Sequence, residues 1–226
     1  MNDTKPFNSE TVDPEIFWNE FRKITNILQS DLNETKQHLN TNDSQFWRRT
    51  FYRSSFAYLE GQTYALRQLF LFYDWWTVDQ DYEDKIRNKK RVQNKDGSEN
   101  VVFAYLPFVQ NIKLLFKAFA IASDIDPLIS DNDKAWELLS KAVNVRNRIV
   151  HPKKSVDLFI SDNEIQLIMY VGGWLLSTSA KLLKKRIQAD IKTIKAMDEC
   201  ARKQFGQPIE PSELDLLIEK FENEDD

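Results

Sequence analysis

The sequence has little of what most metal sites, disulfide scaffolds and β-rich folds require. Its 226 residues include one cysteine, two histidines, five glycines and seven prolines. Sandwiches and doubly wound sheets need many tight turns, so the scarcity of glycine and proline favours long helices joined by few loops. A lone Cys200 excludes an internal disulfide and a cysteine zinc cluster. Two histidines do not make a multi-histidine site within one protomer, so we expect no metal and no cofactor.

Long apolar runs and common enzyme motifs are missing as well. No stretch approaches eighteen uninterrupted apolar residues, and the N-terminus MNDTKPFNSE lacks the basic start and apolar core of a signal peptide. We therefore expect a soluble, cytoplasmic protein that does not bind membranes. The phosphate-binding, zinc-protease and serine-hydrolase motifs G-x-x-x-x-G-K, H-E-x-x-H and G-x-S-x-G do not occur.

Charge is unevenly distributed along the chain. The net charge is −4, yet residues 210–226 hold eight acids and one lysine, a net −7, which leaves +3 for residues 1–209. Bases cluster at 85–95, 146–154 and 181–186. Such clusters bind a polyanion locally or are simply solvated helix faces and loops, and composition alone does not decide between the two. We also consider that the acidic tail shields a basic cleft.

The spacing of apolar residues predicts an all-α protein, an up-and-down bundle of about five helices. The helices are expected over residues 14–39, from about Ser44 to Tyr73, over 104–123, from a cap at Asp131 or Asp133 to about Val150, and from about 161 to 205. Residues 80–102 break the pattern and are expected to form a loop or hairpin insertion after the second helix. We expect one helical domain over 1–209, followed by an acidic tail, 210–226, with a short helix.

Two helices carry patterns that need partners. The first has an apolar face made by Phe17, Phe21, Ile24, Leu28 and Leu32. The second has an apolar seam made by Tyr52, Phe56, Leu59, Thr63, Leu66, Phe70 and Tyr73, with a charged stripe of Arg53, Glu60, Arg67 and Asp74 beside it. Members of the stripe are seven residues and about 10 Å apart, too far to pair with one another, so we expect their partners elsewhere.

The segment Arg146-Asn147-Arg148-Ile149-Val150-His151-Pro152 is the best candidate for chemistry. Histidine has the side-chain pKa nearest neutrality, and arginine grips phosphate oxygens through parallel donors. Positions five apart on a helix point about 140° from each other. Arg146 and His151 therefore converge only if the helix ends between them or a second protomer closes the site. Pro152 predicts such an end, with His151 at or just beyond it.

This segment resembles the Arg-x4-6-His motif of the HEPN superfamily, helical-bundle proteins that include metal-independent endoribonucleases of toxin–antitoxin, abortive-infection and CRISPR systems. The resemblance implies that Arg146 and His151 are the catalytic pair and that Asn147 is the polar residue that often follows the arginine. It also implies a homodimer in which two motifs form one cleft. Toxins of this superfamily often carry tyrosine two positions after the histidine, where this chain has Lys153.

Cleaving RNA without a metal requires a proton acceptor for the 2′-hydroxyl, a proton donor for the leaving oxygen and a cation on the phosphate. We expect 2′,3′-cyclic phosphate and 5′-hydroxyl ends, a single motif histidine per protomer and acid and base from the two copies. The cations that flank the pair, Arg148, Lys153 and Lys154, are the candidate phosphate contacts. Arg53, on the charged stripe of the second helix, is expected to contact either RNA or the surroundings of Glu60. Glu60 is the candidate counter-charge for Arg146, the alternative being a solvated Glu60.

Other interpretations of the sequence remain. A non-catalytic HEPN-like scaffold would use the apolar seam and the acidic tail to bind a protein partner such as an antitoxin or a sensor. A nucleotide-binding regulator would bind a ligand without turnover. In either case His151 would merely cap a helix C-terminus and Arg146 would make a salt bridge. An enzyme would act as a prokaryotic stress or phage-defence effector.

Overall fold

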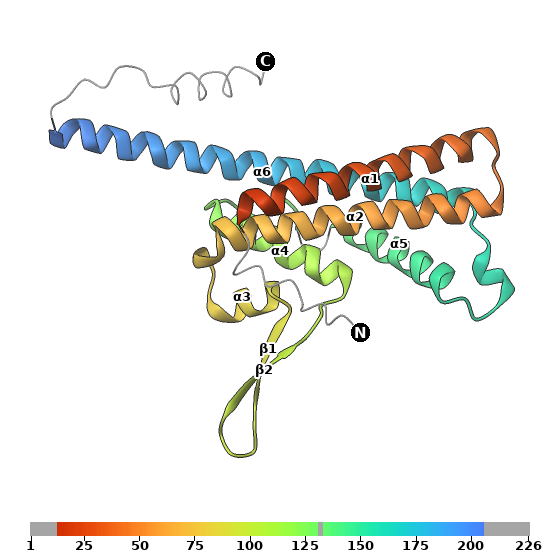
Figure 1. Ribbon diagram of the computed structural model, residues 1–226, viewed down its shortest axis with the longest axis horizontal. Helices are drawn as coiled ribbons and strands as arrows, with labels where there is room; N and C mark the ends of the chain where they lie inside the picture. The colour runs from red at the N-terminus through yellow and green to blue at the C-terminus, as the bar shows by residue number, and fades with distance from the viewer. Residues whose placement is uncertain (1–12, 131–132, 206–226) are drawn as a thin grey trace.

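The computed structural model describes residues 13–130 and 133–205, and these form helices with a single two-stranded sheet (Figure 1). The helices are α1 (Pro14–Thr41), α2 (Gln45–Tyr73), α3 (Gln80–Ile86), α4 (Phe108–Ala122), α5 (Lys134–Val150) and α6 (Asp162–Phe205), with short 3-10 turns η2 (Trp75–Thr77) and η3 (Ser155–Leu158). The predicted all-α class is confirmed. No helix in the described ranges is long and apolar enough to cross a membrane.

Helix starts follow the capping chemistry that the sequence predicts. The Ser44 side chain accepts a hydrogen bond at the start of α2, and Asp133 does the same for α5. The alternative cap, Asp131, lies outside the described residues. The third predicted helix is shorter than expected, because α4 begins at Phe108 rather than at 104. Pro107 explains the difference, since the residue before a proline disfavours helical geometry.

The helices α1 and α2 form an antiparallel hairpin, and α6 packs against α2, α4 and α5 (Figure 1). Gly61 allows the close approach of α1, because a Cβ atom at this position would lie 2.9 Å from Leu28 Cδ1. The largest fully buried side chains come from α2 to α6 and include Tyr52, Phe70, Ile86, Phe119, Leu139 and Ile168. With 44 residues, α6 is about 66 Å long and projects beyond the bundle.

Two positions depart from the predicted apolar faces. Ile24 is 52% exposed, because the face of α1 that meets α2 follows Phe21, Leu28 and Leu32, and Ile24 is turned away from it. Tyr73 is 46% exposed as the last residue of α2, whereas the seam from Tyr52 to Phe70 is buried. Spacing alone thus predicts burial correctly within the helix but not at its last residue.

The predicted insertion contains a helix as well as a hairpin. The strands β1 (Lys89–Gln93) and β2 (Glu99–Phe103) pair antiparallel, with Lys89 opposite Phe103, and project away from the bundle (Figure 1). The seven-residue α3 precedes them, and its Ile86 is fully buried. The sequence did not predict α3, since one buried isoleucine in seven residues gives no periodicity to detect. The expected tail helix within 210–226 lies outside the described residues.

Candidate functional site

The helix α5 ends inside the candidate motif, as predicted. Val150 is its last residue, and His151 is the C-cap, with φ −123° and ψ 62°. The backbone N–H of His151 donates to the carbonyl of Asn147 at 2.9 Å, and Pro152 follows. His151 is exposed. The imidazole therefore lies in solvent at the end of a helix.

Arg146 is held by two neighbours. Its Nη2 donates to Glu60 Oε1 at 2.9 Å, and its Nη1 donates to Asn147 Oδ1 at 3.2 Å. The contact with Glu60, which joins α5 to α2, is the one that the sequence predicts. The two side chains are 33% and 42% exposed, so water screens the pair and its contribution to stability is small. Its structural effect is to fix the direction of the guanidinium, and Asn147 contacts Arg146 through its side chain and His151 through its backbone.

Arg53 covers the end of α5. Its Nη2 donates to the carbonyl oxygen of Ile149 at 2.8 Å, which satisfies one of the carbonyls that a helix C-terminus leaves without an intrahelical partner. The sequence predicts that Arg53 contacts either RNA or the surroundings of Glu60. The structure places it beside the motif, in a contact with the backbone that holds His151.

The segment after the motif is fixed by two further residues of α2. Gln45 makes a paired contact with Ile160: its Nε2 donates to the carbonyl at 2.9 Å, and its Oε1 accepts from the N–H at 2.7 Å. Arg49 Nη1 donates to the carbonyl of Leu158 at 3.0 Å. Neither residue was predicted from the sequence. Their partners are backbone groups of Ile160 and Leu158, which no pattern of side chains indicates.

Arg148 joins the end of α5 to the start of α6. Its Nη2 donates to Glu164 Oε1 at 2.8 Å. Glu164 Oε2 accepts from the N–H of Ser161, and the Ser161 hydroxyl oxygen accepts from the N–H of Glu164, a reciprocal pair called a capping box. Below them the Tyr52 hydroxyl donates to the carbonyl of Ala142 at 3.2 Å, and burial raises the pKa of Tyr52. Arg148 thus has a carboxylate partner that the sequence did not predict, and its phosphate contact stays a prediction.

Lys153 and Lys154 lie exposed just after the motif. Their backbone N–H groups both donate to Asp157 Oδ2 at 2.8 Å, and these two hydrogen bonds lower the pKa of Asp157. The turn η3 is therefore anchored on its own carboxylate, and the two lysine side chains extend from a fixed backbone beside His151.

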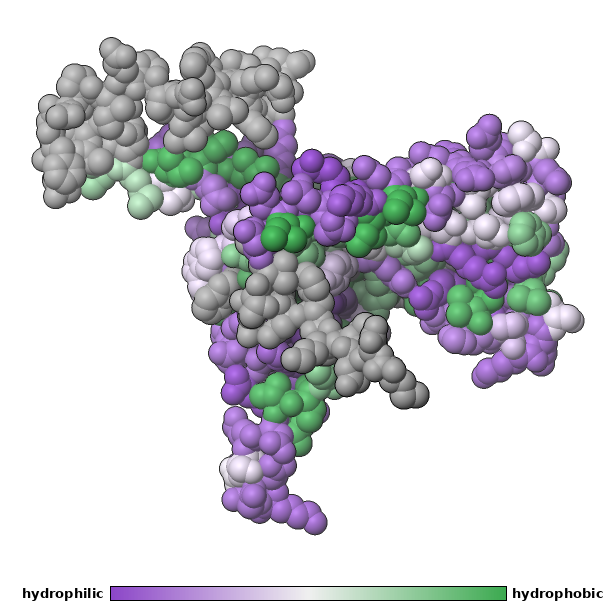
Figure 2. Space-filling view, viewed as in Figure 1, coloured by the Kyte–Doolittle hydropathy of each residue, from purple (hydrophilic) through white to green (hydrophobic). Residues whose placement is uncertain are grey.

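Four exposed apolar side chains lie on the segments at the same end of the bundle, and we call them the apolar rim. Its members are exposed by 40 to 64%: Phe46, Val150, Val156 and Phe159. They are close to the motif because Phe46 and Phe159 flank Gln45 and Ile160, which hydrogen-bond to each other. Figure 2 shows hydrophobic residues at this end among hydrophilic ones. Exposed apolar side chains at this end are available for contact with a partner.

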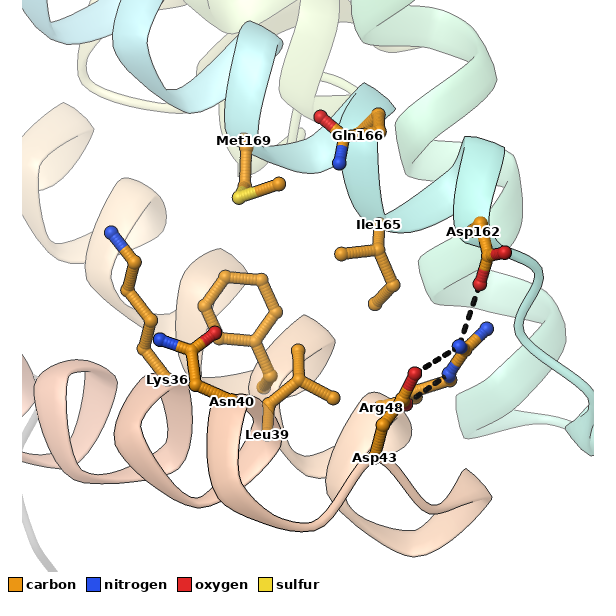
Figure 3. Close-up of a pocket in the computed structure, with 10 residues that line it drawn as sticks. Lys36, Leu39, Asn40, Asp43, Arg48, Asp162, Ile165, Gln166 and Met169 are labelled. Carbon is orange, nitrogen blue, oxygen red and sulfur yellow. Dashed lines mark hydrogen bonds and ion pairs between the residues drawn. The ribbon is translucent and has the colours of Figure 1, made fainter.

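A cavity of about 340 Å³ lies beside this end, between α1, α2 and α6 (Figure 3). Arg48 forms one wall and bridges Asp43 and Asp162, whose carboxylates raise the pKa of the arginine. Its Nη1 also donates to the carbonyl of Ile160 at 3.0 Å. With two carboxylates on its guanidinium, Arg48 does not make the cavity an anion site. Arg146 and His151 are not among the residues that line it.

Comparisons with known proteins add no relative: no protein-family model, no curated protein and no solved structure matches the chain. The chemistry of the site must therefore be argued from its own geometry. That geometry offers one exposed imidazole, one oriented guanidinium and two exposed lysines on a backbone fixed by α2.

Proposed function

We propose that the protein is a metal-independent endoribonuclease of the HEPN type and that Arg146 and His151 carry the reaction. One observation supports this most: Glu60 and Asn147 orient the Arg146 guanidinium on the last turns of α5, and the helix ends between it and an exposed His151. Pre-oriented cations are efficient at stabilising charge that develops on a phosphate during cleavage.

In the proposed reaction the ribose O2′ attacks the adjacent phosphorus and the bond from phosphorus to O5′ breaks. His151 accepts the 2′-hydroxyl proton in one copy, and its counterpart protonates the leaving O5′. Arg146 holds the non-bridging oxygens, and Lys153 and Lys154 contact neighbouring phosphates. The products carry 2′,3′-cyclic phosphate and 5′-hydroxyl ends.

The proposal requires a homodimer, because one protomer has one motif imidazole. The apolar rim of Phe46, Val150, Val156 and Phe159 is suited to such contact, since it adjoins the motif. The projecting part of α6 is not suited to this dimer contact. It starts about 37 Å along α6 from the helix start beside the motif, so a two-fold contact there would keep the two motifs apart.

A second candidate is a non-catalytic scaffold that acts through a protein partner such as an antitoxin or a sensor. The observation in its favour is that three of the candidate cations have partners within the chain: Arg146 with Glu60, Arg148 with Glu164, and Arg53 with the backbone of Ile149. Under this proposal the motif stabilises the end of α5 and the apolar rim binds the partner.

RNA cleavage in excess EDTA separates the two. We expect wild-type protein to cut mixed tRNA and mRNA, and His151→Ala and Arg146→Ala to be inactive at unchanged fold and mass. The matched control is His38→Ala, since the other histidine stacks on Trp47 outside the motif. Products with 3′-hydroxyl ends would refute the mechanism. Intact RNA with all four folded, dimeric proteins would favour the scaffold.

A further inference from the structure

The part of α6 that projects beyond the bundle carries an apolar strip. Arg186 ties α6 to Asp74 at the end of α2, with contacts of 2.6 and 2.8 Å, and the strip begins at the next residue. Its members follow at spacings of four, three and three: Ile187, Ile191, Ile194 and Met197. Ile187 and Ile194 are 40% exposed and Met197 is 68% exposed. Figure 2 shows hydrophobic residues along this projecting part.

Basic residues flank the strip. Between residue 181 and the end of α6 at residue 205 the helix carries eight lysines and arginines and three acids, Asp190, Asp198 and Glu199, a net charge of +5. An apolar strip between lysines is complementary to an amphipathic helix with an acidic polar face, because burial of the apolar side chains and attraction between the flanks act together.

The chain's own C-terminal segment has this character. Residues 210–226 carry a net charge of −7, and PSELDLLIEKF at 211–221 has the spacing of an amphipathic helix. One face would hold Leu214, Leu217, Ile218 and Phe221. Leu216 falls about 160° from the middle of that face, so it would point away from it.

The length of this segment allows it to reach the strip and excludes the motif end. Gly206 and Pro208 directly follow α6, and such residues end a helix and reverse the chain. A helix over 211–221 is about 16 Å long, so it would reach back over Met197 and Ile194. The motif end lies about 64 Å from Phe205 along α6, whereas the segment with a helix in it spans about 50 Å at most. Docking is therefore local.

We infer that residues 211–221 fold back as a helix onto α6 and cover the strip at Ile194 and Met197, with the acidic flanks facing the lysines of α6. This inference is independent of the proposed ribonuclease activity. Under this inference the acidic tail binds α6, the helix that it follows, and does not shield a basic cleft at the motif.

Amide hydrogen exchange of the full chain tests the contact. We expect residues 194–200 to exchange at least tenfold faster in a variant that stops at Gln207 than in the full chain. Leu217→Glu should produce the same acceleration, because it places a charge in the apolar face. The matched control Leu216→Glu should leave the exchange unchanged, and 1 M salt should accelerate exchange in the full chain by screening the flanks.

Two results would overturn the inference. Equal exchange of residues 194–200 with and without the tail would mean that the tail does not cover them. Protection that rises with protein concentration, together with a dimeric mass that the Gln207 stop leaves intact, would mean that a second copy covers the strip instead.

Discussion

Arg53 Nη2 lies 2.8 Å from the carbonyl oxygen of Ile149, two residues before His151. A charged donor from the second helix thus completes the C-terminus of the fifth, and it does so at the point where the candidate motif leaves the helix. Two neighbours on α2, Gln45 and Arg49, extend the same arrangement to Ile160 and Leu158.

Replacement of Arg53 by alanine should destabilise the protein by about 0.5–1.5 kcal/mol, because it removes a hydrogen bond to a carbonyl at the helix end while the exposed guanidinium is screened by water. Urea unfolding measures the change. Arg22→Ala, at an exposed position on α1, is the control and should change the unfolding free energy by less than about 0.5 kcal/mol. Equal effects of the two substitutions would show that the contact does not hold the helix end.

Replacement of Asp74 by asparagine should cost about 3 kcal/mol, because the substitution removes the buried counter-charge of Arg186 and leaves only the exposed Asp190. The Asp74 side chain is 3% exposed and that of Arg186 is 16% exposed. Arg186 also pairs with Asp190, whose side chain is 53% exposed, and this provides a matched control on the same guanidinium. Asp190→Asn should cost less than about 1 kcal/mol. Thermal and urea unfolding measure the stability of both variants. Equal stability of Asp74→Asn and Asp190→Asn would contradict the role of the buried pair.

The Asp157 carboxylate should make the stability of the motif segment depend on pH. Hydrogen bonds from the backbone of Lys153 and Lys154 lower its pKa, so the folded state favours the charged form. The stabilisation is present above the unfolded pKa of about 3.9 and is lost as the pH falls through the lower folded value. The difference in unfolding free energy between wild type and Asp157→Asn should be constant from about pH 5 to 7 and shrink below about pH 4. A difference that grows toward acid pH would reverse the sign and refute the assignment.

Replacement of Glu60 by glutamine should leave the unfolding free energy within about 1 kcal/mol of wild type, because the pair with Arg146 is partly solvated. If Arg146 binds phosphate, the same substitution should tighten RNA binding severalfold, since the guanidinium no longer has a competing carboxylate. Filter binding in the His151→Ala background separates affinity from cleavage. Glu34→Gln, on an exposed part of α1, is the control for net charge.

The helices and the position of the motif could be predicted from the sequence because both depend on local patterns. Ser44 and Asp133 cap their helices, and Pro152 sets the end of α5, through bonds to nearby residues. The same holds for the all-α class. Ile24 and Tyr73 were placed wrongly because periodicity gives a face and not the neighbour that covers it.

The partners of the site residues were harder to predict, because they depend on which helices meet. Glu60 and Arg146 were matched correctly from charge alone, yet the sequence gives no reason to prefer Glu164 as the partner of Arg148. Gln45 and Arg49 were missed because their partners are backbone carbonyls, and these leave no trace in a pattern of side chains.

The bonds that fix the motif segment also set an order for its folding. The donors Arg53, Arg49 and Gln45 lie 96, 109 and 115 residues before the carbonyls that they contact. At a synthesis rate of about 5–20 residues per second, the ribosome needs on the order of 5–20 s to make the intervening chain. The helical hairpin of α1 and α2 therefore emerges long before its acceptors, and the end of α5 takes its final form only when most of the protein has left the ribosome. A nascent chain holds the donors early but completes the site late.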